Sequence, residues 1–347
     1  MRAFSTSARA AVFSLLALAS SSRFVLADPI ADFYANHPVT IAVGSDAGGT
    51  YDLYARAIAR YLGKHIPGSP RVTVQNMPGA GGYTAALHVF GLAPQDGTVI
   101  GAIGSALPYQ PLIDPNAPKF DVPHVNWIGS VSTYNIMMLV RSDVPVHSVD
   151  DLRTHPTVMA TIAPGQLNSL IVAATNSALG TKIKGVNGHP GMADAMLAMM
   201  RGEVDGYPSA PIDALKRNYS KDLADGKIRL LLQFGPAPSP EFPNVPYALD
   251  LAKTPADRSL LDLAQGPLKV GYAYMLGPGV PQERIEALRA AFLATFKDPD
   301  FLADTTKQVL AVAPVTGEDL KARLAQAYQT PTDVIERMRD LYRQLSK

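Results

Sequence analysis

The sequence predicts an α/β protein with two lobes, each a mostly parallel β-sheet flanked by helices. Short β-branched runs alternate with amphipathic helical patterns along most of the chain, which is typical of parallel sheets. The alternation pauses after Ile103 and resumes after Tyr134, so we expect two sheets. A chain of 347 residues is too long for one ordinary domain and long enough for two.

The first lobe is expected to begin with a β-α-β-α-β pattern. We expect strands at Val39–Val43, Arg71–Gln75 and Thr98–Ile103, and helices at Tyr51–His65 and Tyr83–Leu92. Crossover connections of this kind keep the strands parallel. The carboxyl ends of all three strands should therefore meet at one edge of the sheet.

The first expected helix carries signals at its start and along its surface. Thr50 is a suitable N-cap, and Asp52 suits the positive end of the helix dipole. Asp52 also precedes Arg56 by four residues, the spacing of an ion pair on a helix face. Tyr54 and Ile58 belong to the apolar face, so we expect Asp52 and Arg56 on the other face.

The later part of the chain repeats the alternation. We expect strands at Ile136–Val140, Thr157–Ile162, Lys182–Val186, Lys227–Phe234 and Val270–Leu276. We expect helices that open at Ser148, span Asn168–Leu179 and Met192–Arg201, and start again at Pro281, with one or two more at the end. The prolines from Pro236 to Pro246 predict a crossing segment on the surface.

The order of these elements suggests that the second lobe is inserted into the first. We expect the first part of lobe 1 at residues 28–136, lobe 2 at 137–231, and a return to lobe 1 with the C-terminal helices at 232–347. Residues 1–27 are left for a signal peptide.

The N-terminus has the features of a cleavable export signal. Arg2 and Arg9 give a positive start, Ala10–Ala19 is an apolar run, and Val25–Ala27 ends in the small residue of a cleavage site. The run is shorter than the roughly 20 residues that span a bilayer. We expect an exported protein, and an N-terminal helix anchored in the membrane is the alternative.

The composition excludes several classes of function. The 31 Lys and Arg residues nearly balance 30 Asp and Glu residues, and no basic run stands out, so nucleic acid and anionic lipid are not expected partners. The chain has no cysteine, which excludes disulfides, thiolate zinc sites and thiol catalysis.

Three loops rich in glycine or small residues follow the first three strands: Gly44–Thr50, Asn76–Gly82 and Gly104–Ala106. Loops at the carboxyl edge of a parallel sheet lie together. Glycine lets a ligand approach the backbone, and helix N-termini offer N–H donors and partial positive charge. The pattern of three loops predicts an anion site made of backbone amides, although a single loop of this kind is more often an ordinary tight turn.

The enzyme motifs are incomplete. Gly44–Gly49 has the spacing of a P-loop, but Thr50 stands where the lysine is required. Gly79–Gly81 approaches a dinucleotide-binding motif, but Asp96 precedes the next strand instead of following it. The seven histidines are scattered, and no serine lies in a GxSxG motif. We expect no catalysis, no cofactor and no metal.

Five segments carry a family pattern: Gly48–Arg56, Asn76–Gly82, Ala93–Thr98, Gly188–Gly191 and Arg201–Gly206. Together they closely resemble the solute-binding proteins of tripartite tricarboxylate transporters, the Bug family. The similarity covers most of the mature chain. It implies a periplasmic protein with a type II periplasmic-binding-protein fold, a Venus flytrap whose hinge is two crossing strands.

The resemblance also implies the loops that hold the carboxylate of a ligand, often through water. The candidate ligand residues are Ser45, Gly48, Gly49, Thr50, Tyr51, Pro78, Gly79, Ala80, Gly81 and Ser105 in lobe 1, and Gly165, Asn168, Ser169, His189, Pro190 and Asp205 in lobe 2. Asp46 departs from the anion-site pattern, so it either points away or meets a cationic group. His189 either selects the ligand or only fills the space of an aromatic ring.

The function implied by the resemblance is capture of a small carboxylate. Ligands of the family include di- and tricarboxylates, acidic amino acids and aromatic acids, and the partners are membrane permease subunits of a tripartite transporter. We expect a monomer that binds no nucleic acid. The alternative is a ligand-sensing module that signals to a membrane sensor kinase.

Overall fold

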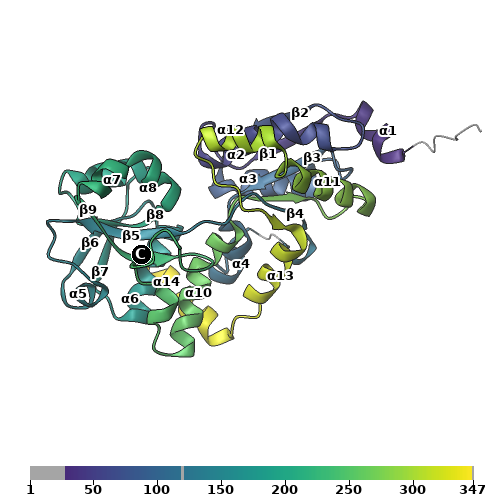
Figure 1. Cartoon of the computed structure of the whole chain (residues 1–347). Coiled ribbons are helices and arrows are strands. Elements are labelled where there is room, and N and C mark those ends of the chain that lie inside the picture. The colour runs from purple at the N-terminus through teal and green to yellow at the C-terminus, as the bar shows by residue number, and fades with distance from the viewer. Residues whose placement is uncertain (1–27, 119–120, 346–347) are drawn as a thin grey trace, which may run out of the picture.

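The computed structural model describes residues 28–118 and 121–345, and the predicted signal peptide lies outside these ranges. Two β-sheets form two lobes, with helices on both faces of each sheet (Figure 1). Within the described ranges, no helix has the length and apolar character needed to cross a membrane. The predicted α/β architecture with two sheets is confirmed.

The strands are β1 (Val39–Val43), β2 (Val72–Asn76), β3 (Val99–Ile103), β4 (Asn126–Ser130), β5 (Ile136–Arg141), β6 (Thr157–Ala160), β7 (Ile183–Val186), β8 (Gly206–Pro211), β9 (Ile228–Phe234), β10 (Ala273–Leu276) and β11 (Val315–Thr316). The helices are α1 (Pro29–Asn36), α2 (Thr50–Leu62), α3 (Tyr83–Leu87), α4 (Gln110–Ile113), α5 (Val149–Thr154), α6 (Leu167–Leu179), α7 (Met192–Met200), α8 (Ile212–Asn218), α9 (Ser220–Ala224), α10 (Pro255–Val270), α11 (Gln282–Thr295), α12 (Pro299–Lys307), α13 (Gly317–Ala327) and α14 (Thr332–Leu345). Short helical turns are η1 (Gly63–His65), η2 (Ala80–Gly82), η3 (His88–Leu92), η4 (Leu107–Tyr109), η5 (Val122–His124) and η6 (Ala248–Leu251).

The first sheet has the strand order β11-β4-β10-β3-β1-β2. β1 pairs in parallel with β2 and β3, so the loops after these three strands lie at one edge, as predicted. β10 pairs with β3 and with β4 in the antiparallel direction. β11 also pairs with β4 in the antiparallel direction. The sheet is therefore mixed, in contrast to the mostly parallel sheet that we expected.

The two faces of the first sheet pack against different helices. Ile41 and Val43 face a core formed with α2 and α11, and Ala42 between them faces the other core, where α3 packs. Side chains alternate between the faces of a strand, so an uninterrupted apolar run is suited to a strand that is covered on both faces. This explains why Val39–Val43 contains no charged residue.

The second sheet has the order β7-β6-β8-β5-β9 and is also mixed. β6 pairs in parallel with β7 and β8, and β5 runs antiparallel to β8 and β9. Ile136 and Met138 of β5 face the core on the α6 side, while Met137 and Leu139 face the core under α7.

Two segments of the chain cross between the sheets side by side. The N–H of Val131 donates to the Tyr272 carbonyl, and the N–H of Tyr272 donates to the Ser132 carbonyl, both at 3.1 Å. The first segment leads from β4 to β5 and the second leads from α10 to β10. The predicted pair of crossing strands at the hinge corresponds to these two segments.

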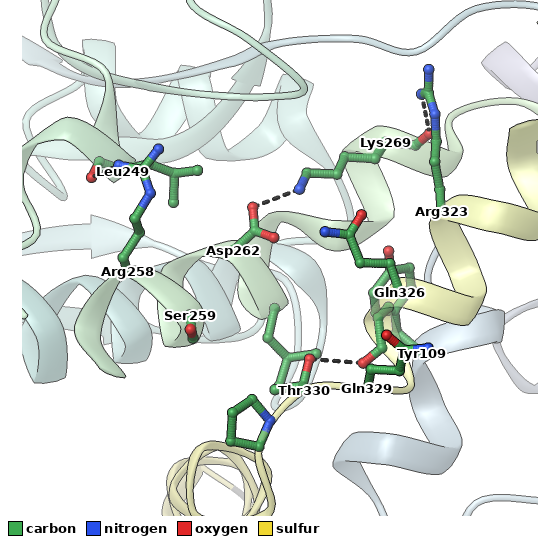
Figure 2. A pocket seen from close by; sticks show the side chains of 13 residues that line it. Tyr109, Leu249, Arg258, Ser259, Asp262, Lys269, Arg323, Gln326, Gln329 and Thr330 are labelled. Atoms are coloured by element: carbon green, nitrogen blue, oxygen red, sulfur yellow. Dashed lines mark hydrogen bonds and ion pairs between the residues drawn. The ribbon is translucent and has the colours of Figure 1, made fainter. Parts of the chain in front are cut away.

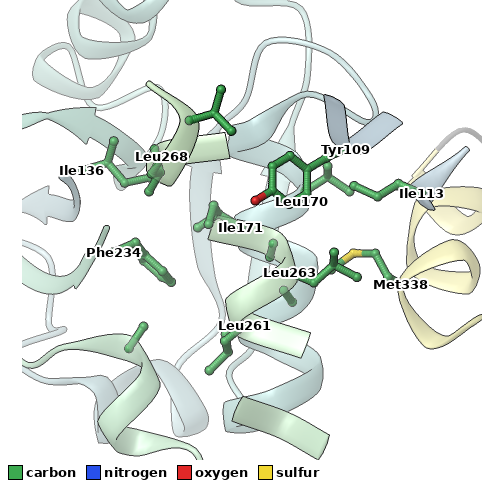
Figure 3. Close-up of a cluster of buried hydrophobic side chains, with 14 of the residues drawn as sticks. Tyr109, Ile113, Ile136, Leu170, Ile171, Phe234, Leu261, Leu263, Leu268 and Met338 are labelled. Atoms are coloured by element: carbon green, nitrogen blue, oxygen red, sulfur yellow. The ribbon is translucent and has the colours of Figure 1, made fainter. Parts of the chain in front are cut away.

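The C-terminal helices connect the two halves of the molecule. One apolar cluster includes Ile103 of the first sheet, Ile171 of α6, Leu263 of α10 and Met338 of α14 (Figure 3). Arg337 of α14 donates to the Ser177 hydroxyl and carbonyl in α6 and to the carboxylate of Asp257 in α10, at 2.7–2.9 Å. Helices α10 and α14 therefore pack on α6 beside the second sheet (Figure 1).

Four predictions about elements are wrong. Three helices, α12, α13 and α14, follow α11 in the described part of the chain, where we expected one or two. Helix α2 begins at Thr50, so its N-cap is Gly49 and not Thr50. Val270 ends helix α10, and the strand that we expected from Val270 begins at Ala273. Helix α10 was not predicted because Gly266 and Pro267 interrupt its pattern, although Thr254 caps it. The capped helix opening at Ser148 is confirmed.

The close approach of α10 to Tyr109 gives a test of the packing. A Cβ atom at Gly266 would overlap the ring of Tyr109, which is buried in the apolar cluster (Figure 3). Alanine favours a helix over glycine by about 1 kcal/mol, but overpacking a core costs about 1–3 kcal/mol. We expect Gly266→Ala to lower the free energy of unfolding, as measured by chemical denaturation.

Gly91 offers a matched control. No atom lies within 4 Å of the position that its Cβ would take. Gly91→Ala should leave the free energy of unfolding unchanged or raise it slightly. Equal stabilities of the two variants would contradict the packing described for α10.

Candidate functional site

A cleft of about 710 Å³ lies between the two sheets. Its walls come from the start of α2, the start of α6, the start of α7, the strands β5 and β8, and helix α8. The lining residues are Gly48, Gly49, Thr50, Leu53, Tyr134, Ile136, Ile162, Gln166, Leu167, Asn168, Gly191, Met192, Ala193, Tyr207, Ser209, Pro211, Ala214, Arg217, Asn218 and Tyr219.

Three helices of nine or more residues begin at this cleft without a side-chain cap. The N-cap residues are Gly49 for α2, Gln166 for α6 and Gly191 for α7, and none of them bonds the first turn through its side chain. Five helices whose N-caps lie elsewhere are capped by Asp28, Ser148, Thr254, Asp298 and Thr316. The first N–H groups of α2, α6 and α7, with the positive ends of their dipoles, can therefore serve an anionic ligand.

The carboxylate of Asp52 holds the first two loops in place. It accepts hydrogen bonds from the Gly48 N–H (2.8 Å), the Arg56 Nε (2.8 Å) and the Asn76 Nδ2 (2.9 Å). Asn76 also donates to the Ser45 carbonyl at 3.0 Å. One buried acid thus joins the loop after β1, the first turn of α2 and the loop after β2. The predicted pair of Asp52 and Arg56 is confirmed, but Asp52 is 1% exposed, not on an open face.

The pKa of Asp52 reflects two opposing effects. Burial by itself would raise the pKa, but the hydrogen bonds from Arg56, Gly48 and Asn76 outweigh burial and hold the pKa below its usual value. Asp52 is therefore ionised at neutral pH. Its charge is paired with Arg56 and with the N–H donors of Gly48 and Asn76, which reduces its repulsion of an anion in the cleft.

Tyrosines surround the crossing segments beside the cleft. The Tyr51 hydroxyl accepts a hydrogen bond from the Ser105 N–H at 3.0 Å, which ties the third loop to helix α2. The ring of Tyr134 lines the cleft and stacks on Tyr272, with ring centroids 5.3 Å apart. Tyr272 also contacts the rings of Tyr51 and Tyr54. Burial raises the pKa of Tyr51, so its hydroxyl stays protonated.

In the second lobe, the predicted polar residues bond mainly to the backbone. The Asn168 Oδ1 accepts from the Ser169 N–H, and the Ser169 hydroxyl donates to the Ala163 and Gln166 carbonyls. The His189 Nδ1 lies 3.1 Å from the Thr161 carbonyl, so this nitrogen carries the proton and Nε2 is the acceptor in the neutral ring.

Asp205 also bonds to the backbone of the second lobe through its side chain. Its Oδ2 accepts a hydrogen bond from the Val158 N–H at 2.8 Å, at the start of β6. The contact joins β6 to the chain that enters β8. From the sequence, Asp205 either orders the ligand site of the second lobe or acts as a structural cap, and the geometry favours the structural role.

The structure brings together some of the predicted ligand residues and separates others. Gly48, Gly49, Thr50 and Asn168 line the cleft, while Ala80, Gly81 and Gly165 line a smaller cavity of about 280 Å³ that shares Gln166 with it. Ser45, Tyr51, Pro78, Gly79, Ser105, Ser169, His189, Pro190 and Asp205 line neither of the two. Asp46 is exposed outside both cavities.

Sequence reasoning missed several residues of the cleft. Tyr207 and Ser209 lie on β8, which was not predicted because its sequence contains two prolines. Arg217 lies on the helix that follows β8 and was missed for the same reason. Gln166 and Gly191 lie in the segments Gly165–Ser169 and Gly188–Gly191, which the family resemblance implies as ligand contacts of the second lobe, although neither residue was singled out.

Another cavity, of about 560 Å³, lies between α10 and α13 (Figure 2). Its charged side chains are mostly bound to the protein: Lys269 pairs with Asp262 at 2.6 Å, and Arg323 donates to the Lys269 carbonyl at 3.1 Å. Across the described ranges, no group of three His, Asp or Glu side chains could hold a metal ion. The cleft between the sheets is the stronger candidate for a ligand site.

Two mixed sheets joined by two crossing segments, with a cleft between them, define the two-lobed fold of periplasmic binding proteins. Solved structures share this fold. A TctC solute-binding protein from Polaromonas, solved without ligand, matches with a TM-score of 0.68 and 20% identity over 87% of this chain and 99% of its own. An R. palustris protein with adipate matches with a TM-score of 0.63 and 19% identity, over 87% and 97%.

The sequence comparisons identify the family. The tripartite tricarboxylate transporter family receptor, TctC, matches residues 54–338, and the chain belongs to this family. The UPF0065 protein in the gbd 5′ region of Cupriavidus necator is 27% identical over 230 residues, 64% of this chain. The match spans 66% of that relative, just under two thirds of its length. The predicted family resemblance is confirmed.

The Asp52 network gives a test of the loop geometry. Asp52→Ala leaves Gly48 and Asn76 without their acceptor, and we expect it to lower the free energy of unfolding by about 2–4 kcal/mol. Arg56→Ala is the matched control, because the Arg56 side chain is 46% exposed and such a pair contributes about 1 kcal/mol or less. Equal losses in chemical denaturation would contradict the central role of Asp52.

The pH dependence of stability follows from the depressed pKa of Asp52. Ionised Asp52 stabilises the folded protein fully above its unfolded pKa of about 3.9, and this contribution is lost as the pH falls through the lower folded value. Asp52→Asn removes the charge at every pH. We expect the stability gap between wild type and Asp52→Asn, measured by denaturation, to shrink below about pH 4; a constant gap down to pH 2 would contradict the assignment.

Proposed function

We propose that this protein is a periplasmic receptor that captures a small carboxylate in the cleft and delivers it to the membrane permease subunits of a tripartite transporter. It acts as a monomer and performs no catalysis. Residues 1–27 direct export, and the two lobes form around the two sheets, with β9, α10 and α14 on the side of the second sheet. Membership of a receptor family supports this proposal.

The observation that carries the proposal is the convergence of α2, α6 and α7, each of nine or more residues and without a side-chain cap, on one cleft. Each dipole contributes about 0.3–1 kcal/mol toward an anion, and each hydrogen bond to an ionised carboxylate about 1.5–3 kcal/mol. A few such contacts reach micromolar affinity, about −8 kcal/mol. Helices from both lobes would hold one ligand, so binding would favour the closed state.

The adipate in the similar R. palustris structure supports a carboxylate as the ligand class. The loops at Pro78–Gly81 and Gly188–Gly191, with Ser45, Tyr51, Ser105 and Ser169, remain predicted ligand contacts. Ala80, Gly81 and Gly165 line the cavity next to the cleft, which a closing motion would bring to the same ligand.

A proline at Thr50 tests the backbone amide directly. Proline is favoured at the first position of a helix, where the missing N–H has no partner within the helix. Gly49 has φ −71° and ψ 163°, which suits a residue before proline. A carboxylate should first be found by its rise in melting temperature. Thr50→Pro should then weaken its binding about tenfold to a hundredfold in calorimetry.

Two further variants complete the test. Leu167→Pro removes the same donor from α6, whose N-cap Gln166 also has a suitable ψ of 160°. Gln282→Pro is the control, since α11 also begins without a side-chain cap but away from the cleft. Gln282→Pro should leave the affinity for the carboxylate unchanged.

A screen of the wild-type protein tests the proposal as a whole. If di-, tri- and aromatic carboxylates all fail to raise the melting temperature, the proposal is wrong.

A further inference from the structure

A contact between the lobes lies on the opposite side of the sheets from the apolar cluster that the lobes share. That shared cluster, which includes Ile103, Ile171 and Met338, joins one face of each sheet through α10 and α14. On the other faces, α12 packs with α2 on the first sheet, and α8 packs with α7 on the second. A rotation of the lobes about the shared cluster therefore changes the distance between α8 and the chain that follows α12.

Arg217, near the end of α8, bonds to the backbone of the other lobe. Its Nη1 donates to the Val309 carbonyl, in the segment after α12, at 3.1 Å. Asp213, one turn earlier on α8, interacts electrostatically with Arg217, and both charges also act on the Tyr54 hydroxyl of α2. Tyr54 in turn donates to the Ala311 carbonyl, two residues after Val309, at 2.8 Å. Arg217 is therefore held between an acid of its own helix and the main chain of the opposite lobe.

The acceptor of this bond lies in a strained turn. Val309 has φ 54°, in the left-handed region, which a β-branched residue rarely adopts. It follows the C-cap of α12 in a Schellman motif, because the Val309 N–H donates to the Thr306 carbonyl and the Leu310 N–H donates to the Thr305 carbonyl. Glycine is the usual residue at this position. The Val309 side chain is 43% exposed, so its burial does not account for the strain.

Strained backbone persists where the surrounding contacts determine its conformation, and it is concentrated at functional sites. Here the strained residue is the one whose carbonyl meets the opposite lobe. We infer that the bond from Arg217 to Val309 is a latch that holds the two lobes together before a ligand arrives. Arg217 is a positioning residue in this role: opening the cleft moves α8 away from the turn after α12 and breaks the bond.

The latch acts in the ligand-free protein, so it does not depend on which ligand the cleft takes. Under the proposed function, a ligand meets lobes that are already close. Less of its binding free energy is then needed to bring the lobes together, and its apparent affinity is higher than it would be with open lobes.

Distances between two spin labels test the latch, because the chain has no cysteine of its own. Leu302→Cys on α12 and Leu197→Cys on α7 place one label on each lobe, at exposed side chains (Figure 1). Pulsed electron spin resonance on dialysed, ligand-free protein should give mainly the short distance of latched lobes. Arg217→Gln in this background should raise the ratio of long to short distances about threefold to tenfold, the effect of one exposed hydrogen bond.

Two control variants separate the hydrogen bond from other contacts. Lys216→Ala removes the neighbouring cation of α8, which pairs with Glu241 at 2.6 Å and does not line the cleft, and it should leave the distances unchanged. Val309→Gly keeps the main-chain carbonyl and suits the left-handed φ, so it should keep the short distance and leave the melting temperature unchanged or raise it. If Val309→Gly opens the lobes as Arg217→Gln does, the valine side chain holds the lobes and the inference is wrong.

Three other results would overturn the latch. Ligand-free wild type could show mainly the long distance, Arg217→Gln could match wild type, or Arg217→Gln could lower the melting temperature without changing the distances. A carboxylate that still raises the melting temperature of wild type would leave the proposed function standing in each of these cases. Conversely, distances that respond to Arg217→Gln as expected support the latch even if no carboxylate binds.

Discussion

One buried carboxylate determines the geometry of the cleft. β1 and β2 pair in register, with Val43 opposite Asn76, so the loops that follow them emerge side by side. Asp52 then accepts hydrogen bonds from both loops and from Arg56. The N-cap of α2 is Gly49, which has no side chain, so the first turn of α2 is left free of a side-chain cap. The hydrogen bond from Gly48 to Asp52 holds the loop just before this open start.

Local signals in the sequence were sufficient to predict most elements. They also predicted that the site lies at the carboxyl edge of the parallel strands of the first sheet. Apolar runs predicted β1, β3 and β5 within one or two residues, and the parallel pairing placed the glycine-rich loops together. The spacing of Asp52 and Arg56 predicted their ion pair. The helical spacing could not predict that Asp52 is buried. Its burial depends on the contact with Asn76, which lies at the end of β2, and spacing along a helix gives no information about a neighbouring strand.

The second lobe was harder to predict, for reasons of backbone chemistry. β8 contains Pro208 and Pro211, which are unusual in a strand, so neither β8 nor the α8 helix behind it was expected. Arg217 was missed with them. By contrast, His189 and Asp205 attracted attention as polar residues in family-like segments, and the structure shows both bonded to the backbone. Polar residues near a ligand loop often shape the loop and do not touch the ligand.

The apolar cluster that runs from the first sheet through α10 and α14 to α6 has a thermodynamic consequence. Two domains with separate interiors can melt independently, each with its own transition. Here the interior of one lobe continues into the other, and Arg337 fastens α14 to both α6 and α10. Heat should therefore disrupt both lobes in a single cooperative step, and any rotation of the lobes has to occur around this shared interior without opening it.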